Sequence, residues 1–293
     1  MNFADYREQL KAIGRVISPD TLAATRNVIL PLYSGARNDD VRVERDVSYG
    51  PDARHRLDVF TPAGGFDPSR PVLVFVHGGG FLAGDKHTEG SPFYSNVGQW
   101  AVRNGCNGVT ITYRLSPMNR WPSGVEDLRL VVDYLQQHGA RHGLSGSKLF
   151  FMGQSAGAAH VAGYVAHAGL YAPKPHGLAG LILLSGIYEF ESMPPSPMEP
   201  AYLGEDRFLY SSRSSLKALA KCELPMLVTV AEFDPPQFEQ QTLKLLAAVQ
   251  ESRGQMPWMV YARGQNHLSM ALYFGLAGDL VAPQVKAFIE LYR

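Results

Sequence analysis

Short apolar runs alternate with amphipathic stretches along most of the chain. Seven runs rich in apolar and β-branched residues predict strands, because continuous runs of this length are typical of strands buried on both faces of a sheet. Apolar residues at helical spacing follow several of these runs, and alternating strands and helices predict a mostly parallel α/β sheet with helices on both faces. The predicted strands are 55–62, 71–77, 107–115, 148–153, 180–186, 226–233 and 258–264.

The clearest amphipathic stretch begins at residue 123. Ser123 and Glu126 have the spacing of a capping box, and apolar residues then recur on one helical face. Gly139 follows the last apolar position, so we expect the helix to end there.

Two segments interrupt the alternation. Residues 1–40 have a helical pattern but precede the first predicted strand, and residues 187–222 are too long and too proline-rich for an ordinary connection. Long insertions in compact domains are often lids or binding loops. We therefore expect residues 41–293 to form a single α/β domain with a small helical lid inserted at about 187–222, to which segment 1–40 contributes.

Composition excludes several classes of function. The 293 residues contain 27 Lys and Arg against 27 Asp and Glu, so no excess charge favours nucleic acid or an anionic membrane surface. Cys106 and Cys222 have no metal-like spacing, and no run approaches the ~20 apolar residues of a membrane helix. The start of the chain lacks the pattern of a secretory signal. We expect a cytoplasmic protein with no metal, membrane span or nucleic-acid partner.

Reactive residues follow four of the predicted strands. Gly-Gln-Ser-Ala-Gly (153–157) follows one strand, and glycines 78–80, Asp234 and His267 follow three others. The serine pattern by itself also fits a tight strand-to-helix turn without chemistry. However, the carboxyl ends of parallel strands meet at one edge of a sheet, so we expect these residues to lie together.

This set of residues predicts nucleophilic catalysis. A serine hydroxyl needs a nearby base, histidine has a suitable pKa, and a carboxylate fixes the histidine tautomer. The chain order Ser155, Asp234, His267 is the order found in α/β-hydrolases. Glu232 is the alternative acid, but Asp234 is favoured because it lies past the apolar run rather than within it.

Four motifs carry a family resemblance. The segments HGGGF (77–81), YRLSP (113–117), GQSAG (153–157) and AEFDPP (231–236) resemble the esterase branch of the α/β-hydrolase fold. More narrowly, they are similar to the hormone-sensitive-lipase-like and kynurenine-formamidase-like carboxylesterases. The resemblance extends from about residue 50 to the C-terminus.

The resemblance implies roles for further residues. In such enzymes the second and third glycines of the HGGG motif and the residue after the serine form the oxyanion hole, here Gly79, Gly80 and Ala156. His77 is expected to support this loop. Gln154 stands where many relatives have His or Asp, which leaves the triad itself intact.

The sequence therefore predicts a serine hydrolase that cleaves small-molecule esters of short acyl or aromatic groups through an acyl-enzyme, without a cofactor. An arylformamidase with the same triad and a non-catalytic ligand-binding protein on a hydrolase fold stay open as alternatives. The apolar lid could equally form a homodimer contact. The side chains expected to line an apolar pocket under the lid are Phe81, Phe190, Met193, Met198 and Tyr202.

Overall fold

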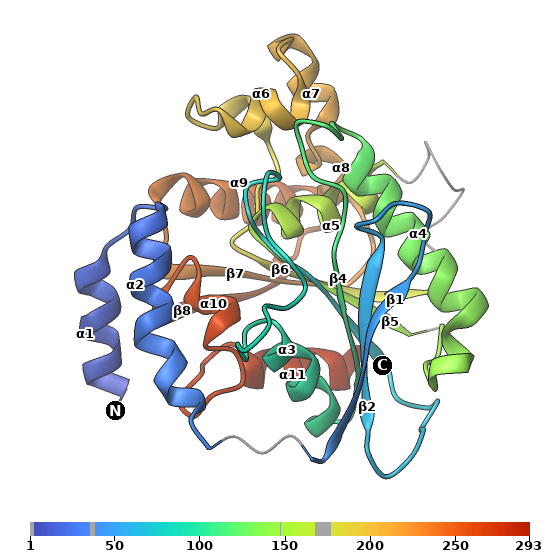
Figure 1. The fold of residues 1–293 in the computed structure, drawn as a ribbon. Coiled ribbons are helices and arrows are strands. Elements are labelled where there is room, and N and C mark those ends of the chain that lie inside the picture. The colour runs from blue at the N-terminus through green and yellow to red at the C-terminus, as the bar shows by residue number, and fades with distance from the viewer. Residues whose placement is uncertain (1–2, 36–38, 147, 168–176) are drawn as a thin grey trace.

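One eight-stranded sheet forms the centre of the molecule (Figure 1). The computed structural model describes residues 3–35, 39–146, 148–167 and 177–293. The strand order is β1-β2-β4-β3-β5-β6-β7-β8, and β2 is antiparallel to both of its neighbours, whereas the pairs from β4 to β8 are parallel. The strands are β1 (Val41–Ser48), β2 (Arg56–Pro62), β3 (Val72–Val76), β4 (Asn107–Ile111), β5 (Leu149–Gln154), β6 (Leu178–Leu184), β7 (Met226–Phe233) and β8 (Trp258–Asn266).

Helices cover both faces of this sheet, as predicted. Along β3, Val74 packs with one apolar cluster and its neighbours Leu73 and Phe75 pack with another, because successive side chains of a strand point to opposite faces. The first cluster includes α4, α5, α8 and α9, and the second includes α3, α10 and α11. Their bounds are α3 (Ser95–Arg103), α4 (Ser123–His138), α5 (Ala156–Ala166), α8 (Leu216–Lys221), α9 (Pro236–Arg253), α10 (Ser269–Leu272) and α11 (Ala282–Tyr292).

The seven predicted strands are all present, but the sequence analysis missed β1. This edge strand reads VRVERDVS, and most of its residues are only partly buried or exposed, so it lacks the apolar run that revealed the other strands. It lies at the edge of the sheet beside β2, and a bulge between Glu44 and Val47 places Asp46 at φ 57°. Bulges of this kind are common at sheet edges.

α4 begins and ends at the predicted positions, but neither end has the predicted cap. Pro122 occupies the cap position, and the Ser123 hydroxyl donates instead to the Asn119 carbonyl at 2.9 Å. At the other end Gly139 keeps a right-handed conformation, and the chain continues into a 3₁₀ turn that Gly143 ends at φ 73°. A glycine four residues later therefore supplies the left-handed conformation that closes the segment.

The N-terminal segment lies along the β8 edge of the sheet. Its helices α1 (Phe3–Ile13) and α2 (Pro19–Ile29) bury Tyr6, Leu10 and Ile29 in a cluster with side chains next to α10, and the Tyr6 ring stacks on that of Tyr273 at 4.2 Å. Residues 1–2 and 36–38 of the predicted 1–40 segment lie outside the described residues.

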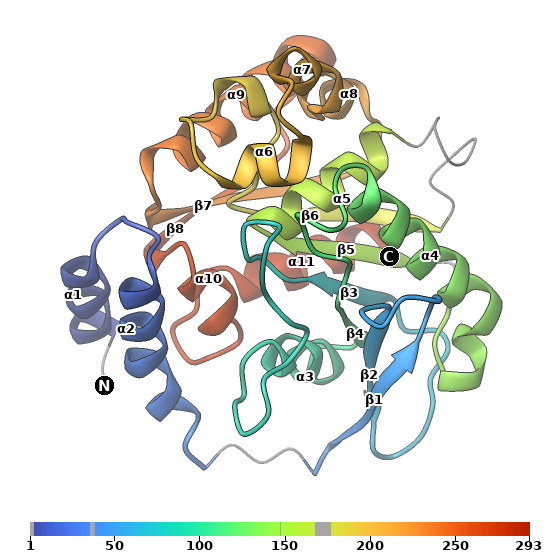
Figure 2. The same ribbon diagram turned by 45° about the horizontal axis from the view of Figure 1, so that its top comes forward.

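The predicted insertion is helical and lies across the top of the fold in Figure 2. It begins with a 3₁₀ turn, Phe190–Ser192, and continues through α6 (Met198–Leu203) and α7 (Tyr210–Arg213) to α8. In the part of the chain that the structure describes, every helix is too short or too polar to cross a membrane.

Candidate active site

Ser155 stands at a sharp turn between β5 and α5. Its backbone has φ 56° and ψ −119°, a conformation that costs a non-glycine residue about 1–3 kcal/mol. Gly157 approaches β3 so closely that a Cβ atom there would overlap the carbonyl oxygen of Val76. The parallel register pairs Val76 with Gly153, so the loop after β3 and the first turn of α5 lie side by side. The turn has the geometry of a nucleophile elbow.

Asp234 contacts the candidate base directly. One carboxylate oxygen lies 2.7 Å from His267 Nδ1, and the other accepts hydrogen bonds from the Ser185 hydroxyl at 2.5 Å and the Ala231 amide at 2.6 Å. The side chain of Asp234 is completely buried. Each oxygen therefore has a fixed partner, and the carboxylate can hold only one orientation.

Glu232, the alternative acid, has a different role. It accepts hydrogen bonds from Arg7 Nε at 3.1 Å and from the Gly264 amide at 2.7 Å. The Arg7 guanidinium lowers the pKa of the Glu232 carboxyl. Glu232 thus joins α1 to β8, and the preference for Asp234 as the partner of His267 agrees with the geometry.

His267 follows β8 and has one nitrogen left for chemistry. Its ring lies 4.2 Å from the Phe238 ring, and its backbone carbonyl accepts a hydrogen bond from Gln154 Nε2 at 2.9 Å. Among the described residues, His267 Nε2 is buried and has no hydrogen-bond partner. If Nδ1–H donates to Asp234, Nε2 carries a free lone pair that can accept a proton.

The glycine loop after β3 has left-handed backbone conformations that favour glycine. Gly79 has φ 126° and Gly80 has φ 60°, and a Cβ atom on Gly79 would overlap the Ala83 carbonyl oxygen. That tight approach belongs to a turn in which the Leu82 and Ala83 amides both donate to the Gly79 carbonyl at 3.1 Å. Ala156 begins α5 beside this loop.

The buried His77 side chain stabilises the glycine loop. Its Nδ1 lies 2.6 Å from the Gly78 carbonyl oxygen, and its ring stacks on Tyr113 at 4.4 Å. Burial lowers the pKa of His77 to about 4, so the ring is neutral at pH 7 and Nδ1–H can donate to the carbonyl. This arrangement matches the role that the family resemblance implied.

All five predicted pocket residues lie near α5 and the glycine loop. Phe81, Phe190, Met193 and Tyr202 are buried in one cluster with Ala156 and Phe238. Met198 is partly buried, and its sulfur lies so close to Gly80 that a Cβ atom there would overlap it.

Sequence reasoning missed three contributors to this site. Ser185 follows β6 at φ 46° and donates to Asp234, Phe238 packs on His267, and Gln154 holds the His267 backbone. In the sequence, Gln154 was noted only because many relatives have His or Asp at that position. Phe238 was only one of several apolar residues at helical spacing. The signal for Ser185 was its place at the end of the predicted strand 180–186, which the structure pairs with the serine strand.

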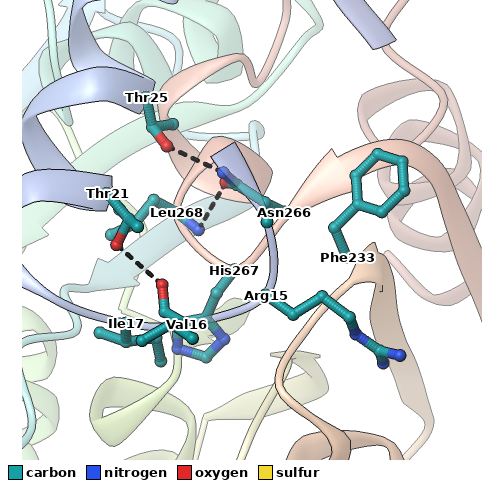
Figure 3. A pocket seen from close by; sticks show the side chains of 10 residues that line it. Arg15, Val16, Ile17, Thr21, Thr25, Phe233, Asn266, His267 and Leu268 are labelled. Carbon is teal, nitrogen blue, oxygen red and sulfur yellow. Dashed lines mark hydrogen bonds between the residues drawn. The ribbon is translucent and has the colours of Figure 1, made fainter. Parts of the chain in front are cut away.

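The loop between α1 and α2 covers His267 (Figure 3). It lines a narrow pocket of about 10 Å³, which has room for one water molecule. Arg15 Nε donates to the Asp234 backbone carbonyl at 2.5 Å, and its guanidinium pairs with Glu239 at 2.6 Å. The remaining residues lining the pocket are Gly14, Val16, Ile17, Thr21, Thr25, Phe233, Asn266 and Leu268.

The sheet order, the serine turn after β5, the acid after β7 and the histidine after β8 together define an α/β-hydrolase fold. Residues 57–171 match the BD-FAE family model, a segment that includes the glycine loop and Ser155. Within the described residues, no group of three or more His, Cys, Asp or Glu side chains could hold a metal ion.

Known proteins support the same class. An acetyl esterase of Salmonella schwarzengrund is 35% identical over 91 residues, which cover 31% of this chain and 27% of that protein. The matched stretch thus spans about a quarter of the length of this relative. Esterase B of Lactobacillus rhamnosis has a TM-score of 0.75 at 15% identity, covering 98% of this chain and 96% of that one. An esterase of Pseudomonas putida has a TM-score of 0.67 at 21% identity, covering 98% and 94%. The predicted resemblance to α/β-hydrolase esterases is confirmed.

Proposed function

We propose that the protein is a serine carboxylesterase that hydrolyses esters of short acyl or aromatic groups. The observation that carries the proposal is the His267–Asp234 contact of 2.7 Å, with Nε2 of the same histidine left without a partner among the described residues. The local match to an acetyl esterase and the structural likeness to esterases support the choice of esters as the substrate class.

In this mechanism Ser155 attacks the ester carbonyl while His267 Nε2 takes the hydroxyl proton. Asp234 holds the imidazole in the required tautomer and stabilises the imidazolium that forms. Backbone amides of Gly79, Gly80 and Ala156 stabilise the oxyanion, and each such donor contributes roughly 3–4 kcal/mol in comparable enzymes. His267 then protonates the leaving alcohol, and it later activates the water that releases the acid from Ser155.

From the order of the strands we infer on which side of Ser155 each half of the substrate binds. The glycine loop follows β3 on one side of β5, and His267 follows β8 on the other. The alcohol must face His267 because it receives the proton from Nε2. The carbonyl oxygen faces the glycine loop on the β3 side, and we assign the acyl chain to this same side, under the lid insertion. The loop at 14–17 then covers the alcohol side.

The test is hydrolysis of p-nitrophenyl acetate, butyrate and decanoate by the wild type and by Ser155→Ala. We expect the wild type to favour the short chains and Ser155→Ala to lose at least a thousandfold in kcat, because removal of a triad member leaves only binding and oxyanion stabilisation. Ser69→Ala is the matched control, since Ser69 is exposed in a turn before β3. Retained activity in Ser155→Ala contradicts the proposal.

The same triad could hydrolyse a formamide, so N-formylkynurenine belongs in the same assay. A hundredfold or greater preference for this amide over phenyl acetate would replace the carboxylesterase by an arylformamidase. A fluorophosphonate labels an activated serine. If the wild type does not react with it, the non-catalytic ligand-binding alternative is favoured.

A further inference from the structure

The lid helix α6 packs directly on the glycine loop. Met198 and Tyr202 are four residues apart, so they share one face of this helix. The Met198 sulfur lies so close to Gly80 that a Cβ atom on Gly80 would overlap it. Beside it, the rings of Phe81 and Tyr202 stack at 4.3 Å with an angle of 4° between their planes. The face formed by Met198 and Tyr202 thus covers Gly80 and Phe81.

Hydrogen bonds to neighbouring segments hold α6 in this place. The Trp121 amide donates to the Tyr202 carbonyl at 2.8 Å, and Tyr210 Oη donates to the Gly204 carbonyl at 3.0 Å. Arg213 also donates to the Leu203 carbonyl at the end of the helix. Because three contacts from three positions fix the end of α6, its inner face is a wall of defined position.

Met198 is the part of this wall next to the glycine loop. Behind it, Tyr202 Oη lies 3.3 Å from His160 Nδ1, and the His160 ring packs edge-on against Phe81 at 5.3 Å. These aromatic rings are buried and interlocked, whereas Met198 is unbranched and only partly buried. Met198 is therefore the adaptable part of the wall beside Gly80.

We propose that Met198 sets the length limit of the acyl chain and that the preferred substrates are esters of two- to four-carbon acids. The inference rests on the proposed function, in which the acyl group points toward the β3 side of Ser155. There the wall formed by Met198 stops a longer chain soon after the carbonyl carbon. Replacing Met198 by alanine removes three heavy atoms, which is space for two or three methylene groups.

The test compares kcat/KM for p-nitrophenyl acetate, butyrate and hexanoate. Each methylene that becomes buried contributes about a fourfold gain. We therefore expect Met198→Ala to raise the hexanoate-to-acetate ratio of kcat/KM by at least tenfold. Met198→Phe enlarges the wall, and we expect it to lower the butyrate-to-acetate ratio by at least threefold. Met118→Ala is the matched control, because Met118 is 89% exposed, and its ratios should equal those of the wild type.

Opposite shifts in the two Met198 variants support the inference. Ratios within twofold of the wild type in both variants overturn it, and the esterase proposal then survives if Ser155→Ala is inactive. A wild type that hydrolyses none of the three esters overturns the proposed function first, and this inference with it. If Met198→Ala unfolds, Met198→Val provides a smaller cavity with the same expected direction.

Discussion

Asp234→Asn is the substitution that most directly tests the assignment of the acid. In the wild type one carboxylate oxygen accepts from the Ser185 hydroxyl and the Ala231 amide, and the other contacts His267 Nδ1. An asparagine must place its single carbonyl oxygen toward the two donors, since its amide group cannot accept from them. The amide then donates to Nδ1, which moves the ring proton to Nε2.

The size of the effect follows from this tautomer. With a proton on Nε2, His267 can no longer accept the proton of Ser155, and an equivalent change in a serine protease lowers kcat about 10⁴-fold. A factor of 10⁴ corresponds to about 5.4 kcal/mol of transition-state stabilisation. We expect a loss of this order in kcat, with a much smaller change in KM, because the Asp234 carboxylate is completely buried and both of its oxygens contact protein groups.

Glu232→Gln serves as the matched control, two residues away in the chain. Glu232 binds Arg7 and the Gly264 amide rather than His267, so its neutralisation should leave kcat within about fivefold of the wild type. The assay is steady-state hydrolysis of p-nitrophenyl acetate at pH 7.5, corrected for spontaneous hydrolysis. The reasoning is refuted if Asp234→Asn keeps more than a tenth of the activity, or if Glu232→Gln loses as much.

Two further predictions concern buried polar groups. Gln154→Ala leaves the His267 carbonyl without its hydrogen-bond donor. We therefore expect the free energy of unfolding, measured in urea, to fall by about 1–3 kcal/mol and kcat to fall about tenfold. An unchanged kcat would show that Gln154 does not position His267. Burial lowers the pKa of His160 to about 3, so the unfolded chain binds more protons below pH 6.5 and stability falls as the pH falls from 6.5. Between pH 7 and 4, His160→Asn should lose about 3 kcal/mol less stability than the wild type, and equal losses would contradict this account.

The sequence predicted the parts of the fold that have strong local signals. Buried parallel strands such as β3 and β5 are continuous apolar runs, and reactive residues at their carboxyl ends must meet at one edge. The choice between Asp234 and Glu232 had a local basis as well, because the residue past the end of the strand turns toward the edge where His267 lies.

Features that depend on distant parts of the chain could not be predicted in the same way. The edge strand β1 has a mostly charged sequence that acquires strand structure only by pairing with β2. Gln154 acts through the carbonyl of a residue 113 positions away, and Met198 meets Gly80 only because the insertion folds back over the sheet. No spacing in the sequence records these contacts.

The two coverings of the site come from separate parts of the chain. The loop between α1 and α2 lies over His267, and α6 lies over Gly80, with the serine strand between these two sides of the sheet. Substitutions at distant positions without shared partners usually have additive effects. Under the proposed function, one covering can change while the other is kept, so exchange of a short segment would alter the acid or the alcohol that is accepted and leave Ser155, Asp234 and His267 in place.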